Sequence, residues 1–435
     1  MSNGKSSPLR TSRLGRIGQF GRLATGLAGG LVAEGARTLA SGKRPALRDM
    51  MLTPRNLTRI ADDMARLRGA AMKVGQLLSM DAGNLLPPEL AELLGRLRSQ
   101  ADAMPLHQLS PILVNAWGAD WQAHFRRFDQ RPMAAASIGQ VHYAERLDGT
   151  PLAIKVQYPG VKQSIDSDVD NLATLLRVTR LLPDSIELAP LLTEAKLQLH
   201  AEADYRREAA AQQRCAARLA DDPGLVVSVV QEDLSSDTIL AMSFLRGAPL
   251  ESITAQPQSE RNSVVQRLFT LLFRELFEFG EVQTDPNFAN FLYLPERGQV
   301  GLLDFGATRE YAPEAREAYH HLLHSGMHND TEQMASAARQ LGYFAQDIAP
   351  AQQTAVLRLF QLACEPLRHD GEYDFGRSDL AQRIRTLGMD LSFEQEYWHS
   401  PPVASLFLHR KIAGLFLLAQ RLQARVNVRA CLPVD

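Results

Sequence analysis

The fold of this chain is decided by Gln283-Thr284-Asp285-Pro286-Asn287-Phe288-Ala289-Asn290, which is followed after a short apolar run by Leu302-Leu303-Asp304-Phe305-Gly306. The stretch supplies an Asp, an Asn five positions later and a second Asp in the next motif. Carboxylate and amide oxygens bind Mg²⁺ together with phosphate oxygens and water. The order of these side chains therefore indicates a site where a metal ion meets the phosphates of a nucleotide.

Protein kinases place their catalytic groups in this order. On that pattern Asp285 is the candidate base or substrate-orienting group, and Asn290 and Asp304 are the candidate Mg²⁺ ligands. Asp-Phe-Gly alone recurs by chance, so the ordered pair of motifs carries the prediction. The His-Arg that precedes the catalytic Asp of ordinary kinases is replaced here by Gln283-Thr284.

Lys155 stands at the centre of a predicted strand, Leu152-Ala153-Ile154-Lys155-Val156. A cation among apolar neighbours is unfavourable unless it faces a cleft or an anion. In kinases a strand lysine holds the nucleotide phosphates and is itself held by a helix carboxylate. A lysine on the solvent face of the strand is the alternative, and the downstream motif favours the phosphate-binding interpretation.

Carboxylates that could hold Lys155 lie on a later predicted helix. Glu202 and Asp204 are two residues apart, about 200° round a helix, and therefore point in different directions. One could hold Lys155 while the other meets a second basic group. An exposed charged face is an equally good interpretation of this segment.

The second basic group is predicted to be Lys73. Lys73 and Gln76 are three residues apart on an otherwise apolar helical segment, so they share one face. Two polar groups on such a face need partners, and we expect them to lie against the cleft as a lid.

Ala134-Ala135-Ala136-Ser137 stands where a kinase would have its Gly-rich phosphate loop, just before the first predicted strand. Each alanine adds a Cβ and restricts φ, so we expect a tighter nucleotide-binding loop. The alternative is an ordinary loop of small residues.

The hydrophobic pattern predicts an α+β fold in four parts. Residues 1–50 form a basic arm, 51–130 a helical extension, 131–246 a lobe that carries the strands with a helical insertion, and 247–435 a helical lobe. Within the third part, residues 137–158 are predicted to form two strands joined by a turn at Asp148-Gly149-Thr150. A bilobal protein-kinase-like fold has this order along the chain, with the sheet-containing lobe first and the helical lobe after it.

The composition and charge of the chain limit the classes of partner and the compartment that we expect. The formal net charge of the 435 residues is −2, which gives no reason to expect nucleic acid. Residues 1–50 carry nine Lys or Arg against two acids, so this arm could be an organelle-targeting segment, a contact for anionic lipid or a solvated tail. No run reaches the roughly 18 apolar residues of a spanning helix, so we expect no transmembrane segment. The three distant cysteines suggest buried thiols in a reducing compartment.

Together these segments resemble the UbiB-like atypical kinase family, the aarF-domain kinases linked to coenzyme Q. Residues 72–76 (Met-Lys-Val-Gly-Gln) look like its Lys-x-Gly-Gln signature, Ala134–Ser137 like its Ala-rich loop and Glu202-Ala203-Asp204 like its Glu-x-Asp motif. The Gln283–Asn290 stretch is similar to the eukaryotic coenzyme Q branch, whereas the bacterial branch usually has His-Ala-Asp-Pro-His-Pro-Gly-Asn.

The resemblance implies a kinase-like fold whose helical extension packs over the cleft. It implies binding of ATP or ADP with Mg²⁺, ATP hydrolysis with little phosphorylation of proteins, and support of ubiquinone biosynthesis with a lipid or quinone intermediate and other coenzyme Q proteins as partners. The protein would be peripheral to a membrane, in a bacterial cytoplasm or on the mitochondrial matrix side. A true protein or small-molecule kinase and a non-catalytic lipid-binding scaffold are the two alternatives.

Overall fold

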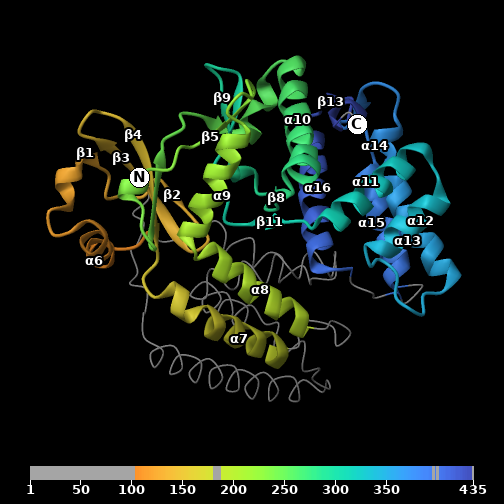
Figure 1. Ribbon diagram of the computed structural model, residues 1–435, viewed down its shortest axis with the longest axis horizontal. Helices are drawn as coiled ribbons and strands as arrows, with labels where there is room; N and C mark the ends of the chain where they lie inside the picture. The colour runs from red at the N-terminus through yellow and green to blue at the C-terminus, as the bar shows by residue number, and fades with distance from the viewer. Residues whose placement is uncertain (1–102, 180–187, 394–396, 398–400, 434–435) are drawn as a thin grey trace, which may run out of the picture. The chain divides into compact units, whose positions relative to one another are not determined.

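The computed structural model describes residues 103–179, 188–393, 397 and 401–433 (Figure 1). The chain divides into two compact units. The described residues up to Arg207, together with Val230–Phe244, form the first unit, and Glu208–Val229 with Leu245 onward form the second. Lys73, Gln76 and the predicted basic arm lie outside the described residues.

The first unit contains a short helix, an antiparallel sheet and a pair of helices. Its elements are α6 (Leu106–Trp117), η2 (Trp121–His124), β1 (Phe125–Phe128), β2 (Ala134–Ala135), β3 (Gly139–Arg146), β4 (Pro151–Gln157), α7 (Val161–Thr179), α8 (Leu188–Glu202), η3 (Glu232–Leu234) and β6 (Ile239–Ser243). Helix α9 (Tyr205–Arg218) starts in this unit and continues into the second.

The sheet of the first unit follows from alternating apolar residues and one tight turn. Its strand order is β1-β3-β4-β6, and β2 pairs with β3. The predicted hairpin between β3 and β4 is present: the backbone N–H of Thr150 donates to the Asp148 side chain at 2.9 Å, and Gly149 has φ 88°, which glycine adopts without strain. Buried Leu152, Ile154 and Val156 alternate along β4 and form the core beneath the sheet.

A buried polar chain fastens the start of the described segment to this sheet. Gln140 accepts the backbone N–H of Met104 at 2.8 Å and lies 2.8 Å from His142 Nε2, while His142 Nδ1 lies 2.8 Å from the Asp129 carbonyl oxygen. A carbonyl only accepts, so the Nδ1–H tautomer donates to it and Nε2 accepts from Gln140. Burial lowers the pKa of His142, which keeps this tautomer neutral.

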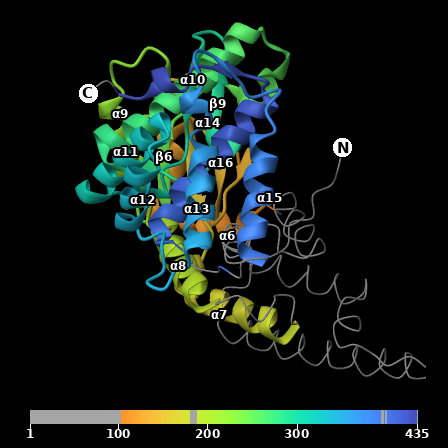
Figure 2. The same ribbon diagram turned by 90° about the vertical axis from the view of Figure 1, so that its right-hand side faces the viewer.

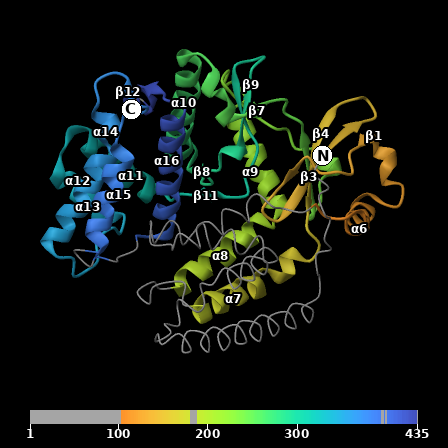
Figure 3. The same cartoon turned by 180° about the vertical axis from the view of Figure 1, so that it is seen from behind.

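The second unit is mostly helical. Its elements are β5 (Leu225–Val227), β7 (Ala248–Pro249), η4 (Leu250–Ala255), α10 (Gln258–Phe273), η5 (Arg274–Phe279), β8 (Glu281–Gln283), η6 (Phe288–Asn290), β9 (Phe291–Leu294), β10 (Gln299–Leu302), β11 (Thr308–Glu310), α11 (Pro313–His328), α12 (Thr331–Gln340), α13 (Pro350–Ala363), α14 (Glu365–Arg368), β12 (Tyr373–Asp374), α15 (Leu380–Phe393), α16 (Val403–Arg421), β13 (Arg425–Val426) and η7 (Arg429–Cys431). Figures 2 and 3 show α10 beside α16, and α13 beside α15.

Short strands of the second unit position the site. One sheet has the order β5-β10-β9-β7, and β8 pairs antiparallel with β11 so that Gln283 lies opposite Thr308. The two motifs identified in the sequence sit at the ends of these strands. Strands β8 and β11 were not predicted from the sequence, because three-residue strands carry too little periodicity to be recognised.

Helix α16 is the one described helix that is long and apolar enough, by length and composition, to cross a membrane. Its buried face includes Phe407, Leu408, Leu415 and Leu418, which belong to the core of the second unit. Core helices of soluble proteins share this length and composition. The contacts of its charged residues, described below, show how this helix serves the fold.

Candidate nucleotide site

Asp285 lies in a loop that its neighbours hold on both sides. Before it, Thr284 donates from its backbone N–H and its hydroxyl to the Ala307 carbonyl oxygen, at 3.2 and 2.8 Å. After it, Asn287 caps the turn Phe288–Asn290 by accepting the Ala289 N–H at 3.2 Å. The Thr284 bonds tie this loop to the segment that follows Asp304.

The Asp285 carboxylate orients Asn290. Asn290 Nδ2 donates to Asp285 Oδ2 at 3.1 Å. A carboxylate only accepts, so this bond requires the amide nitrogen to face Asp285 and turns Oδ1 the other way, where it can meet a cation. The other Asp285 oxygen pairs with the Arg410 guanidinium at 3.1 Å, and both side chains are largely buried.

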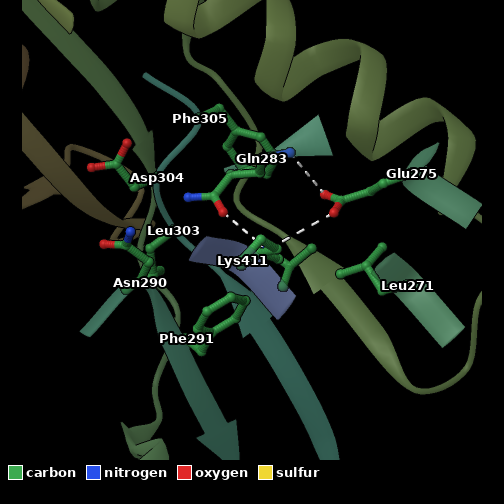
Figure 4. Close-up of a pocket in the computed structure, with 10 residues that line it drawn as sticks. Leu271, Glu275, Gln283, Asn290, Phe291, Leu303, Asp304, Phe305 and Lys411 are labelled. Carbon is green, nitrogen blue, oxygen red and sulfur yellow. Dashed lines mark hydrogen bonds and ion pairs between the residues drawn. The ribbon is translucent and has the colours of Figure 1, made fainter. Parts of the chain in front are cut away.

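Asp304 begins a tight turn at the end of β10. Its Oδ1 accepts the Gly306 backbone N–H at 2.9 Å, and the Leu303 N–H donates to the Asn290 carbonyl oxygen at 3.0 Å. The neighbouring Phe305 is buried in the core of the second unit. These bonds fix the carboxylate of Asp304 beside Asn290, and Figure 4 shows the two side chains on the same side of the pocket.

The donor set fits Mg²⁺ held together with phosphates. No group of three or more His, Cys, Asp or Glu in the described part of the chain could hold a metal ion without a co-ligand. Mg²⁺ commonly takes one or two carboxylates and completes its shell with water and phosphate oxygens. The Asp304 carboxylate and the Asn290 amide oxygen would supply such a partial ligand set, and water and phosphate oxygens would complete it.

A small pocket adjoins these two side chains (Figure 4). Asn290, Asp304, Gln283, Glu275 and Lys411 supply its polar lining, and Leu271, Phe291, Leu302, Leu303 and Phe305 complete it. Its cavity of about 10 Å³ is at the lower limit for one water molecule.

A buried ion pair closes the far side of the pocket. The Lys411 ammonium lies 3.8 Å from the Glu275 carboxylate, with the two side chains 3% and 5% exposed. Lys411 also donates to Gln283 Oε1 at 3.0 Å and lies 5.2 Å from the centre of the Phe291 ring. Burial raises the pKa of Glu275 to about 7, and the Lys411 ammonium and the Gln283 N–H offset the effect only in part.

Three residues of helix α16 therefore contact the Asp285 loop. Arg410 pairs with Asp285, Lys411 holds Gln283, and Gly414 packs so closely that a Cβ there would be 2.3 Å from Pro286 Cβ. The buried Lys411 and the ion-paired Arg410 show that this helix is fitted to the loop by its polar residues as well as its apolar ones.

Lys155 belongs to the first unit and is described within it. It lies on β4 between β3 and β6, opposite Val141 and Leu240, and is 8% exposed. Its ammonium is 5.2 Å from the centre of the Tyr205 ring at the start of α9. Lys155 is thus buried in the sheet against an aromatic face, which excludes the solvent-face alternative.

The Ala-rich segment forms a hairpin with β3. Ala134 and Ala135 are strand β2, paired with Val141 and Gln140, and the Ala136 N–H donates to the Gly139 carbonyl oxygen at 2.9 Å. The expectation that this segment precedes the first strand was wrong. Strand β1 comes earlier, and its four residues, Phe-Arg-Arg-Phe, were too few to show alternation.

Ser137 links the hairpin to the carboxylate of Glu202, donating to it at 2.8 Å. Gly139 fits because a Cβ would lie 2.4 Å from the Val156 carbonyl oxygen and 2.8 Å from the Tyr205 hydroxyl. Glu202, Ser137 and the Lys155 strand are therefore parts of one packed arrangement in the first unit.

Asp204 has a structural role in the described residues. It accepts the Arg207 backbone N–H at 3.0 Å, two residues after α9 starts, which is an N-cap. Its predicted pairing with Lys73, and the lid function of Lys73 and Gln76, fall outside the described residues and stay predictions.

Comparison with known proteins identifies the family. Residues 96–338 match the ABC1 atypical kinase-like domain. The chain is 38% identical to the mitochondrial atypical kinase COQ8 of Saccharomyces cerevisiae, over 97% of this chain and 84% of that protein. It is also 38% identical to the mitochondrial atypical kinase COQ8B of Rattus norvegicus, over 96% of this chain and 79% of that one. The chain belongs to the ABC1 atypical kinase-like family.

Within the ABC1 family it matches the COQ8 branch, as the Gln283–Asn290 stretch predicted. A solved structure of Mycobacterium tuberculosis Rv3197 in complex with erythromycin has the same fold, with a TM-score of 0.59, 24% identity, and coverage of 86% of this chain and 94% of that one. The expected α+β, kinase-like fold class is confirmed.

The support of the ABC1 site by α16 and η5 was not predicted from the sequence. Arg410, Lys411, Gly414 and Glu275 are far in sequence from the Asp285 loop. A signal was present, because two cations interrupt an otherwise apolar helix, but sequence alone could not say what they would meet.

Proposed function

We propose that this ABC1 family member is a kinase-fold ATPase that binds ATP or ADP with Mg²⁺ and supports ubiquinone biosynthesis at a membrane. One observation carries the catalytic part. Asp285 turns the Asn290 amide so that its oxygen faces away from Asp285, on the same side of the pocket as the Asp304 carboxylate. Such a pair of oxygens supports Mg²⁺ that carries phosphates.

The residues would divide the work as follows. Asn290 and Asp304 hold the metal, which neutralises phosphate charge when it is bound. Asp285, paired with the Arg410 guanidinium, orients the attacking water. In the first unit Lys155 and the Ala134–Ser137 hairpin bind the phosphates, and Glu202 positions Lys155 with the help of Ser137.

Water is favoured as the acceptor because the chain has little room for a protein-binding activation segment. β11 starts two residues after Gly306 and α11 starts at Pro313. In protein kinases this interval contains the activation loop that controls the site. Ala312-Pro313-Glu314, which imitates a kinase signature, is here the start of α11.

The biosynthetic role rests on the relatives, whose names are COQ8 and COQ8B. By that kinship we infer action in coenzyme Q biosynthesis, with a lipid or quinone intermediate and other coenzyme Q proteins as partners. Both relatives are named as mitochondrial, so the protein would be bound peripherally to a membrane, on the mitochondrial matrix side or in a bacterial cytoplasm.

Asp304→Asn should abolish Mg²⁺-dependent nucleotide binding. The substitution keeps the shape and the bond to Gly306 but removes the charge that the metal requires. Binding of ADP is measured by calorimetry with and without Mg²⁺, on wild type and variant. If the variant binds and hydrolyses MgATP like wild type, the assignment of the site is wrong.

Two other functions have distinct readouts. A protein or small-molecule kinase would transfer label from γ-labelled ATP to a partner or metabolite, and Asp285→Ala would stop the transfer. A lipid-binding scaffold would restore quinone intermediates in cells that lack the protein even when it carries Asp304→Asn. The ATPase proposal expects no labelled acceptor and no restoration.

A further inference from the structure

Gln283 occupies the position before Thr284-Asp285 where ordinary kinases have histidine, and it is buried, with 6% of the residue exposed. Its backbone N–H donates to Glu275 Oε1 at 3.4 Å, and its side chain lies in the pocket beside Asn290 and Asp304. The function proposed above uses none of its atoms.

The orientation of the Gln283 amide follows from its neighbour. The Lys411 ammonium is 3.0 Å from the amide and can only donate hydrogen bonds. The atom that faces it must therefore be Oε1, and the amide NH₂ must face the opposite way. A flipped amide would set donor against donor, so the contact with Lys411 allows only this orientation.

The Gln283 NH₂ is buried and has no hydrogen-bond partner among the described residues. In Figure 4 it points toward the side of the pocket that holds Asn290 and Asp304. Burying an amide donor without a partner costs about 1–3 kcal/mol. An oxygen is expected to meet this group when the site is working.

The size of the cavity indicates which oxygen accepts from the Gln283 NH₂. Its volume of about 10 Å³ admits about one water molecule, and a phosphate group is too large for it. Mg²⁺ gives up its waters reluctantly and usually retains several of them. A water between the Gln283 NH₂ and the metal ligands fits both the space and the chemistry.

We propose that Gln283 is a positioning residue for the metal. Its NH₂ donates to an ordered water that bridges to the Asn290–Asp304 ligand pair, and Lys411 fixes the amide in the donating orientation. Glu275 supports both, since it contacts the Lys411 ammonium and accepts the Gln283 backbone N–H. This inference rests on the proposed function, because it requires that Asn290 and Asp304 bind the metal.

The test compares three variants in a Mg²⁺ titration of ADP binding, followed by calorimetry. Gln283→Met keeps the length of the side chain and removes the donor. Gln283→His keeps one nitrogen to accept from Lys411 and one N–H to donate. Gln212→Met is the matched control, because Gln212 is a buried glutamine of the same unit that donates to the Ser228 carbonyl oxygen, away from the pocket.

We expect Gln283→Met to raise the Mg²⁺ concentration for half-saturation by about tenfold or more, the range seen when supporting hydrogen bonds of metal sites are removed. ADP binding without Mg²⁺ should not change. Gln283→His should stay within about threefold of wild type, and Gln212→Met should lower stability without moving the Mg²⁺ midpoint. A purely structural role for Gln283 would instead affect binding with and without Mg²⁺ alike.

Lys411→Met should shift the Mg²⁺ midpoint in the same direction, because the amide is then free to rotate. The double variant with Gln283→Met should be no worse than the poorer single one, since both act through one bond. The inference is overturned if Gln283→Met keeps the wild-type midpoint, or if Gln283→His behaves like Gln283→Met. If wild type shows no Mg²⁺-dependent binding, the proposed function falls as well, so the two failures are distinguishable.

Discussion

Gly414→Ala should lower Mg²⁺-dependent ATP turnover by about a hundredfold while the protein stays folded. The added Cβ would lie 2.3 Å from Pro286 Cβ and 3.2 Å from its Cγ. A proline ring cannot swing away as a flexible side-chain end can, so the backbone next to Asp285 must move. Misplacing a catalytic group by about 1 Å can cost about a hundredfold in rate.

The stability change from Gly414→Ala should be small by comparison. Alanine gains about 1 kcal/mol over glycine inside a helix. Overpacking costs about 1–3 kcal/mol. The two oppose each other, so the net loss in the free energy of unfolding should not exceed about 2 kcal/mol, and the damage should appear in catalysis. Displacement of the loop also lengthens the contact between Asp285 and Arg410, which lies one turn earlier on α16.

Gly388→Ala is the matched control for this variant. Gly388 is inside α15 of the same unit, and a Cβ there would meet nothing within 4 Å. The control should gain up to about 1 kcal/mol of stability from helix propensity alone and keep wild-type turnover. Steady-state ATP hydrolysis and thermal unfolding of both variants check the expectation. Equal turnover in Gly414→Ala and Gly388→Ala would show that close packing of α16 on Pro286 is not needed for activity.

The chemistry-bearing motifs could be predicted from the sequence because each is local. Asp285 and Asn290 are five residues apart in one loop, and the hydrogen bond between them is set by that spacing. The β3–β4 hairpin was likewise signalled by Asp148-Gly149, whose φ only glycine adopts easily. A few neighbouring residues determine short-range geometry of this kind.

The support for those motifs could not be predicted, since it depends on packing between distant segments. Lys411 and Gln283 are 128 positions apart, and the segment around Lys411 alone shows only a cation in an apolar helix. The same three strands that hold the loop, β8, β10 and β11, are four residues long or shorter. Their pairing is fixed by tertiary contacts that periodicity does not record.

Lys411→Met should destabilise the protein by about 3–5 kcal/mol at pH 8, and by much less at pH 5. Loss of one partner of a buried ion pair leaves the other charge uncompensated, and this accounts for the destabilisation of about 3–5 kcal/mol at pH 8. The partner is Glu275, whose pKa burial has raised to about 7 from an ordinary value of 4.5. Methionine preserves the length and apolar character of the side chain, so the packing of α16 changes little.

The sign of the pH dependence follows from the direction of that shift. A carboxyl whose pKa is higher in the folded state than in the unfolded one binds its proton more tightly when folded. The free energy of unfolding therefore falls as pH rises from about 4.5 through 7. In wild type the Lys411 ammonium limits this fall by stabilising the carboxylate. Without it the pKa of Glu275 rises further, so the fall becomes deeper and extends to higher pH.

Urea unfolding of wild type, Lys411→Met and the double variant Lys411→Met/Glu275→Gln at pH 5 and pH 8 tests this prediction. At pH 5 Glu275 is protonated in the folded state of all chains that carry it, so Lys411→Met loses little more than one hydrogen bond to Gln283, about 1 kcal/mol. At pH 8 the single variant should be far less stable than wild type, and the double variant should recover most of the difference because no buried charge remains. Equal destabilisation at both pH values, or no recovery in the double variant, would mean that Lys411 does not act by balancing the charge of Glu275.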